Sequence, residues 1–119
     1  MKKVAQIASA LGDNSRLRII WMLEEGPRCV CQLTEVLELA PSTVSRHLLV
    51  LRQAGLIDSF KQGRWIFYYL ACADSAAANA LKWVLGELAA SNLASQDRQR
   101  LTQVQVPDCE GELPIFEKE

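Results

Sequence analysis

The spacing of apolar residues changes from a helical period to a strand pattern after Gly55. Before Gly55, apolar side chains recur every three or four residues, which gives an α-helix one buried face. After it, residues 56–61 and 64–70 are rich in β-branched and aromatic residues, and Gln62 and Gly63 between them are typical of a turn. We therefore expect a mainly helical domain that carries one β-hairpin.

Three helices are predicted in the first forty residues. The first spans about residues 3–11, and the second spans about 15–25, where Pro27 follows and stops the run. A third helix begins directly after this proline. Its first turn is expected to contain Cys29 and Cys31.

A fourth helix is predicted between Pro41 and Gly55, with Ser42 as its cap. Val44, Leu48 and Leu51 have helical spacing and form its expected buried stripe. The polar residues of the same segment therefore face elsewhere.

The last predicted helix covers residues 74–91. Its leucine and alanine stripe, over about residues 80–93, is typical of a dimer interface or a core and not of a membrane surface. We expect one folded domain over residues 1–96 and a partly irregular C-terminal tail over 97–119, where prolines and a glycine argue against regular structure.

The composition fits one small soluble domain. The chain has 119 residues, of which 50% are apolar, 7% aromatic and 23% charged, and this excludes a disordered or fibrous chain. The apolar runs are too short to cross a bilayer, and the N-terminus lacks the apolar stretch of a signal peptide. We expect a cytoplasmic protein without membrane contact.

The net charge of −1 hides two halves of opposite sign. Residues 1–69 carry nine basic and six acidic side chains, whereas residues 70–119 carry four basic and eight acidic ones. The basic half contains the fourth helix and the hairpin, so the small net charge does not argue against binding to nucleic acid.

The order of elements is that of a winged helix-turn-helix, which places its second helix in the major groove of DNA and its hairpin beside the backbone. Hydroxyl groups suit phosphates, and arginine and glutamine side chains can reach base edges. The predicted DNA-binding residues combine these types: Ser42, Thr43, Ser45, Arg46 and His47 on the helix, and Lys61, Gln62 and Arg64 at the hairpin tip.

Three segments resemble the ArsR/SmtB family of bacterial metal- and metalloid-responsive repressors. They are Cys-Val-Cys-Gln-Leu at 29–33, Ser-Thr-Val-Ser-Arg-His-Leu at 42–48 and Leu-Arg-Gln-Ala-Gly-Leu-Ile at 51–57. Residues 10–13 and 16–19 also match the family's usual first turn, and the resemblance covers roughly residues 4–91. It implies a homodimer joined by the first and last helices, which binds double-stranded operator DNA of inverted-repeat symmetry and leaves it when an inducer binds.

Cys29 and Cys31 resemble the binding site for trivalent arsenic or antimony in the arsenic-responsive members of this family. Thiolates prefer soft, thiophilic ions, and As(III) takes three sulfur ligands. Cys29 and Cys31 are two residues apart in sequence, so in a regular helix their side chains would point in directions that differ by about 200°. Both can bind one ion only if this turn frays or unwinds. Such a distortion would move the recognition helix.

The third ligand is left open by the sequence, because Thr34 occupies the position where the arsenic-responsive members have a further cysteine. Cys109 in the tail has the reach to fold back onto the site and is our preferred candidate. Cys72, which is also expected to be a buried packing residue, and a water or buffer thiol are the alternatives.

Other functions have less support in the sequence. Residues 74–91 offer Asp74 and Glu87 but no histidine, which argues against the family's zinc site between the last helices. A thiol-redox repressor, with a disulfide or persulfide formed by Cys31 and a distant cysteine such as Cys109, is the main alternative. We expect no enzyme activity, because the chain has no glycine-rich phosphate loop and no nucleophile beside a plausible base.

Overall fold

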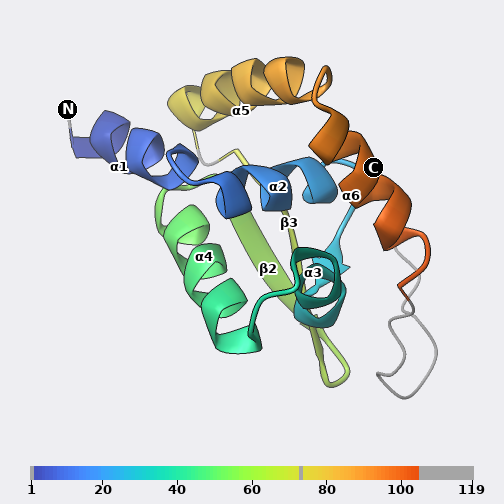
Figure 1. Cartoon of the computed structure of the whole chain (residues 1–119). Coiled ribbons are helices and arrows are strands. Elements are labelled where there is room, and N and C mark those ends of the chain that lie inside the picture. Colours follow the sequence, from blue (N-terminus) through green and yellow to red (C-terminus); the bar gives the residue numbers. More distant parts are fainter. Residues whose placement is uncertain (1, 73, 105–119) are drawn as a thin grey trace.

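The computed structural model describes residues 2–72 and 74–104 and contains a helical bundle with a small sheet (Figure 1). The helices before the hairpin are α1 (Lys2–Leu11), α2 (Asn14–Leu23), α3 (Val30–Leu37) and α4 (Pro41–Gln53). The strands are β1 (Arg28–Cys29), β2 (Ile57–Gln62) and β3 (Trp65–Leu70), and two further helices follow, α5 (Ser75–Leu88) and α6 (Asn92–Leu101). The predicted fold class, mainly helical with a β-hairpin in a winged helix-turn-helix, is confirmed.

Acidic and hydroxyl side chains cap several of the helices. The Asp13 carboxylate accepts the backbone N–H of Arg16 at the start of α2, and Asp74 accepts that of Ala77 at the start of α5. Each bond satisfies one of the backbone donors that a first helical turn leaves without a partner.

The start of α4 differs from the prediction. Ser42 is not its cap, because the helix already begins at Pro41 and Ala40 occupies the cap position without a side-chain hydrogen bond. Proline suits the first helical position, since the N–H that it lacks would have no partner there. The Ser42 side chain is exposed and remains available on the surface.

The sheet has three strands in the order β1-β3-β2, all antiparallel, of which the sequence predicted two. The third strand, β1, places Arg28 opposite Tyr68 and Cys29 opposite Phe67. The hairpin turn is also shifted by one residue. Gln62 pairs with Trp65, so the turn residues are Gly63, with φ of +64°, and Arg64.

The core lies where α2, α3, α4 and α5 meet, with α2 at the centre of the bundle in Figure 1. The predicted stripe of α4 is confirmed, because Val44, Leu48 and Leu51 are completely buried. Leu81 and Val84 of α5 also contribute to the core of the chain itself.

The helix α6 crosses the domain boundary that we expected after residue 96. Asp97 is only 1% exposed, and its two carboxylate oxygens accept hydrogen bonds from the Arg18 guanidinium at 2.8 and 2.9 Å. Arg98 donates to the backbone oxygen of Trp21 at 3.0 Å and lies over its ring, while Arg100 donates to the backbone oxygen of Val36 at 2.8 Å. The packed structure therefore extends to Leu101 at least.

Within the part of the chain that the structure describes, every helix is too short or too polar to cross a membrane.

Candidate nucleic-acid interface and thiol site

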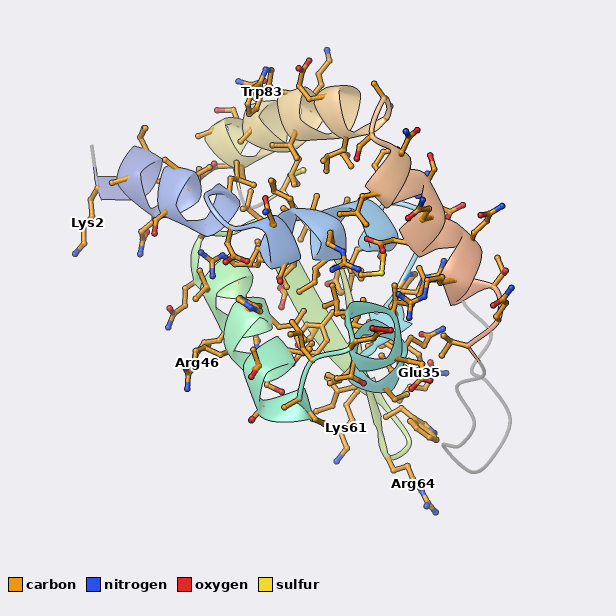
Figure 2. All side chains as sticks on the ribbon, in the orientation of Figure 1. Lys2, Glu35, Arg46, Lys61, Arg64 and Trp83 are labelled. Atoms are coloured by element: carbon orange, nitrogen blue, oxygen red, sulfur yellow. The ribbon has the colours of Figure 1, made fainter. Side chains whose placement is uncertain are left out.

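The exposed face of α4 carries three of the side chains predicted to bind DNA. Ser42, Ser45 and Arg46 are exposed, whereas Thr43 is half-buried. Arg46 extends away from the bundle in Figure 2. Polar and basic side chains on one face of a helix with a buried opposite face suit entry into a DNA groove.

The hairpin tip supplies a second basic group of side chains. Lys61, Gln62 and Arg64 are all exposed, and Figure 2 shows Lys61 and Arg64 at the end of the molecule farthest from α5. Because β2 and β3 are joined by a two-residue turn, these side chains are held close together on a short, regular hairpin.

His47 lies on a different side of α4 from Ser45 and Arg46. Its side chain is 15% exposed, and its Nδ1 lies 3.1 Å from Nη1 of Arg16 and 4.0 Å from the Asp13 carboxylate. Arg16 also donates to the backbone oxygens of Ala10 and Ser9, which lie in the last turn of α1. In this structure His47 therefore connects α4 to the junction of α1 and α2, where the sequence had predicted a side chain that faces DNA.

Cys29 precedes α3 and does not lie in its first turn, which corrects the sequence-based prediction. It is the N-cap of the helix and at the same time a residue of β1. The backbone N–H of Gln32 donates to the Cys29 sulfur. In return, the side-chain oxygen of Gln32 accepts a hydrogen bond from the Cys29 backbone N–H at 3.0 Å. This reciprocal pair is a capping box in which sulfur takes the usual place of a hydroxyl oxygen.

The two thiols already contact each other. Cys29 is 2% exposed and is hydrogen-bonded to the side chain of Cys31, which is half-buried. The predicted divergence of about 200° between the two side chains assumed helical geometry at Cys29, which instead has an extended backbone with φ of −89° and ψ of 164°. Burial is the main cause that raises the pKa of Cys29 to about 11, and the bond to Cys31 adds to it.

Aromatic residues of the hairpin surround this thiol pair. Cys29 and Phe67 form a small buried cluster against which Cys31, Phe60 and Trp65 pack. The rings of Phe60 and Phe67 are stacked with their centroids 5.6 Å apart. The thiol site is thus part of the junction between α3 and the hairpin.

The predicted third ligands are not brought to the site among the residues that the structure describes. Thr34 donates its hydroxyl to the backbone oxygen of Cys31 at 2.9 Å, and Cys72 is exposed two residues beyond the end of β3. Strand geometry separates Phe67 from Leu70 by about 10 Å, so Cys72 lies well away from Cys29. Cys109 lies outside the described residues. Within residues 2–72 and 74–104, the side chains nowhere form a group of three metal-binding donors.

Two features were missed by the sequence analysis. The Gln32 side chain supports Cys29, and the signal for it was the glutamine three residues after a possible cap. Leu49 is 53% exposed on the same helix as Arg46, and the signal was an apolar residue outside the buried stripe of α4.

This fold and this surface define the winged-helix class of DNA-binding regulators. Residues 13–59 match the family described as "Bacterial regulatory protein, arsR family". An HTH-type transcriptional regulator of Methanocaldococcus jannaschii is 41% identical over 70 residues, which cover 58% of this chain and 79% of that protein. The chain belongs to the arsR family of bacterial regulatory proteins.

Named relatives and solved structures agree with this family. The arsenical resistance operon repressor of Bacillus subtilis is 41% identical over 71 residues, which cover 59% of this chain and 68% of that protein. The structure of HlyU from Vibrio cholerae aligns with a TM-score of 0.64 at 27% identity, over 74% of this chain and 94% of that one.

A possible ArsR-family regulator from Mycobacterium bovis, described as a homodimeric winged helix-turn-helix DNA-binding domain, aligns with a TM-score of 0.61 at 28% identity. The alignment covers 74% of this chain and 82% of that one. The family is thus one of regulatory proteins, and this neighbour is described as DNA-binding.

Proposed function

We propose that this protein is a homodimeric transcriptional repressor that leaves its operator when Cys29 and Cys31 bind trivalent arsenic or antimony. The observation that carries the proposal is the contact between the two thiols at the start of α3. It places two soft sulfur donors beside each other, at the point where the start of α3 meets the hairpin.

The proposed DNA contacts come from α4 and the hairpin tip. Ser42, Ser45 and Arg46 face the major groove, with Thr43 at the edge of this face, and Lys61, Gln62 and Arg64 contact the backbone beside it. His47 belongs to the proposed interface as a support, since its ring is engaged with Arg16.

The proposed dimer uses α1 and α5. An apolar groove between these helices is lined by Val4, Ile7 and Trp83 among other residues, and Val4 and Trp83 are 64% and 66% exposed. Large exposed apolar side chains that lie together favour contact with another protein surface. A two-fold dimer would present two copies of α4 to an operator with inverted-repeat symmetry.

The chemistry at the thiols is a condensation. Arsenite is As(OH)3 in neutral solution, and each thiol replaces one hydroxyl group, so that two As–S bonds form and two water molecules leave. The third position on arsenic is taken by the remaining hydroxyl or, in our preferred arrangement, by the thiol of Cys109. The cadmium resistance regulator of Staphylococcus aureus is 35% identical over 68 residues, so divalent thiophilic ions are included in the test.

Release of DNA is explained by the elements that contain the two thiols. Cys29 belongs to β1, which pairs with β3 of the hairpin, and Cys31 belongs to α3, which packs against α4. Drawing both sulfurs onto one ion changes the junction between these elements. The two parts of the proposed DNA surface then lose the relative position that the operator requires.

The test is release of a fluorescent operator duplex, followed by anisotropy during titration with arsenite. We expect wild type and Cys72→Ser to release DNA at the same arsenite concentration, and Cys29→Ser/Cys31→Ser to remain bound. Cys72→Ser is the matched control, because it removes a thiol that is exposed and distant from the site. Release of the double variant at the wild-type concentration would refute the proposal.

A thiol-redox repressor is the second candidate, and the contact between the two thiols favours it too. A peroxide would oxidise two thiols to a disulfide with loss of two hydrogen atoms, whereas arsenite adds the mass of arsenic. Intact mass after each treatment, compared with DNA release, separates the two functions. Cadmium or antimony in place of arsenite identifies the inducing ion in the same assay.

A further inference from the structure

Leu49 is exposed in the middle of α4. It is 53% exposed, whereas Leu48 and Leu51 on either side of it are completely buried. Leu49 also belongs neither to the core cluster nor to the partly buried residues that pack against it.

The position of Leu49 places it on the proposed DNA-binding face. It follows Ser45 by four residues and Arg46 by three, and residues at these spacings are neighbours on one side of a helix. Ser42, one turn before Ser45, is exposed on the same side. Leu49 thus extends a face of two hydroxyl groups and a guanidinium by one apolar side chain.

Base edges in the major groove offer one prominent apolar group, the C5 methyl of thymine. Hydroxyl and guanidinium groups find hydrogen-bond partners on phosphates and base edges, but a leucine side chain in the same groove has the thymine methyl as its complement. Contact between the two removes apolar surface of both from water, which is favourable.

We propose that Leu49 contacts the methyl group of a thymine in each operator half-site and so determines specificity at that base pair. The inference rests on the proposed function, since it requires α4 to lie in the major groove. It assigns to α4 an apolar contact beside the polar ones of Ser45 and Arg46.

The experiment replaces thymine by uracil, which removes the methyl group and leaves the hydrogen-bonding edge unchanged. The probe is the duplex that the full-length wild-type protein selects from a randomised pool. Each thymine is replaced in turn, and binding is measured by anisotropy. We expect one position in each half-site to weaken binding by about fourfold, the factor expected for burying one methyl group.

The variants Leu49→Ala and Leu93→Ala complete the design. Leu93 on α6 is 48% exposed, so it controls for removal of an equally exposed leucine away from the proposed DNA surface. We expect Leu49→Ala to bind the thymine duplex more weakly and to be indifferent to uracil at the sensitive position. Leu93→Ala should keep the wild-type sensitivity, and thermal unfolding of both variants confirms that they are folded.

The outcomes separate this inference from the function on which it rests. Wild type that binds every uracil duplex as tightly as the thymine duplex overturns the role of Leu49, although operator binding itself stands. The same conclusion holds if Leu49→Ala keeps the full uracil effect. If the protein selects no duplex, the proposed repressor function fails instead, and the inference fails with it.

Discussion

Cys29 and Phe67 face each other as antiparallel partners in the sheet. One belongs to the thiol pair and the other to the hairpin whose tip carries Lys61 and Arg64. A structural change at the two thiols can therefore be transmitted to the hairpin through the pair Cys29 and Phe67. A second route leads through α3 to α4.

Lys61→Ala is expected to weaken DNA binding and to lower its dependence on salt. If the lysine contacts one phosphate, its removal reduces the slope of log K against log salt by about 1. Anisotropy titrations at several salt concentrations measure this slope. Lys82→Ala, which removes the same charge from an exposed position on α5, is the control, and equal slopes for both variants would contradict a role for the hairpin tip.

His47→Ala is expected to lower the free energy of unfolding by about 1 kcal/mol, because it removes the partner of Arg16. DNA affinity should fall with it, but the salt slope should stay at the wild-type value, since the ring is directed at Arg16 and Asp13 and not at a phosphate. Urea unfolding and the salt titration together check this. A reduced slope with unchanged stability would show that His47 contacts DNA directly.

Asp97→Ala is expected to destabilise the fold by about 3 kcal/mol. Its buried carboxylate accepts hydrogen bonds from the Arg18 guanidinium on both oxygens. Removing it leaves the guanidinium without this partner. Because Arg18 is partly exposed, the loss should stay at the lower end of values for buried pairs. Urea unfolding measures it, with Asp58→Ala as control: its pair with Arg52 is half-exposed, and we expect a loss below about 1 kcal/mol.

The Cys29 thiol is expected to react slowly with iodoacetamide near neutral pH and faster as the pH approaches 11. Burial raises the pKa of Cys29 to about 11, so that little of the reactive thiolate is present at lower pH. Mass spectrometry of peptides after timed labelling gives the rate for each cysteine. Exposed Cys72 is the internal reference, and equally fast labelling of Cys29 at neutral pH would contradict the raised pKa.

The same raised pKa has a consequence for stability. A thiol that is harder to ionise in the folded state than in the unfolded state stabilises the fold while it is protonated. This contribution is complete below about pH 9 and is lost as the pH rises towards 11. Cys29→Ser should therefore show a smaller loss of stability than wild type over this pH range.

The sequence predicted the elements that have a strong pattern of their own. The buried stripe of α4 and the aromatic strands of the hairpin are repeated over several residues, and their burial agrees with the prediction for Val44, Leu48 and Phe67. These patterns carry enough signal because each element buries one complete face.

The elements that the sequence did not predict are defined by their partners. β1 has two residues and exists because β3 offers a free edge, so its own sequence carries no alternating pattern. α6 is mostly polar, and it is held by Asp97, Arg98 and Arg100. Cys29 was placed in the first turn of the helix for the same reason, since its true position depends on the pairing of β1 with β3.

The two-residue length of β1 also bears on how an inducer gains entry. A strand at the edge of a sheet with only two paired residues can separate locally, while the helical core behind it stays intact. Such opening would expose Cys29, a residue that is otherwise only 2% exposed, without unfolding the domain. The pairing of β1 with β3, which holds Cys29 in its buried position, is therefore the contact that would have to break for a small solute to reach this thiol.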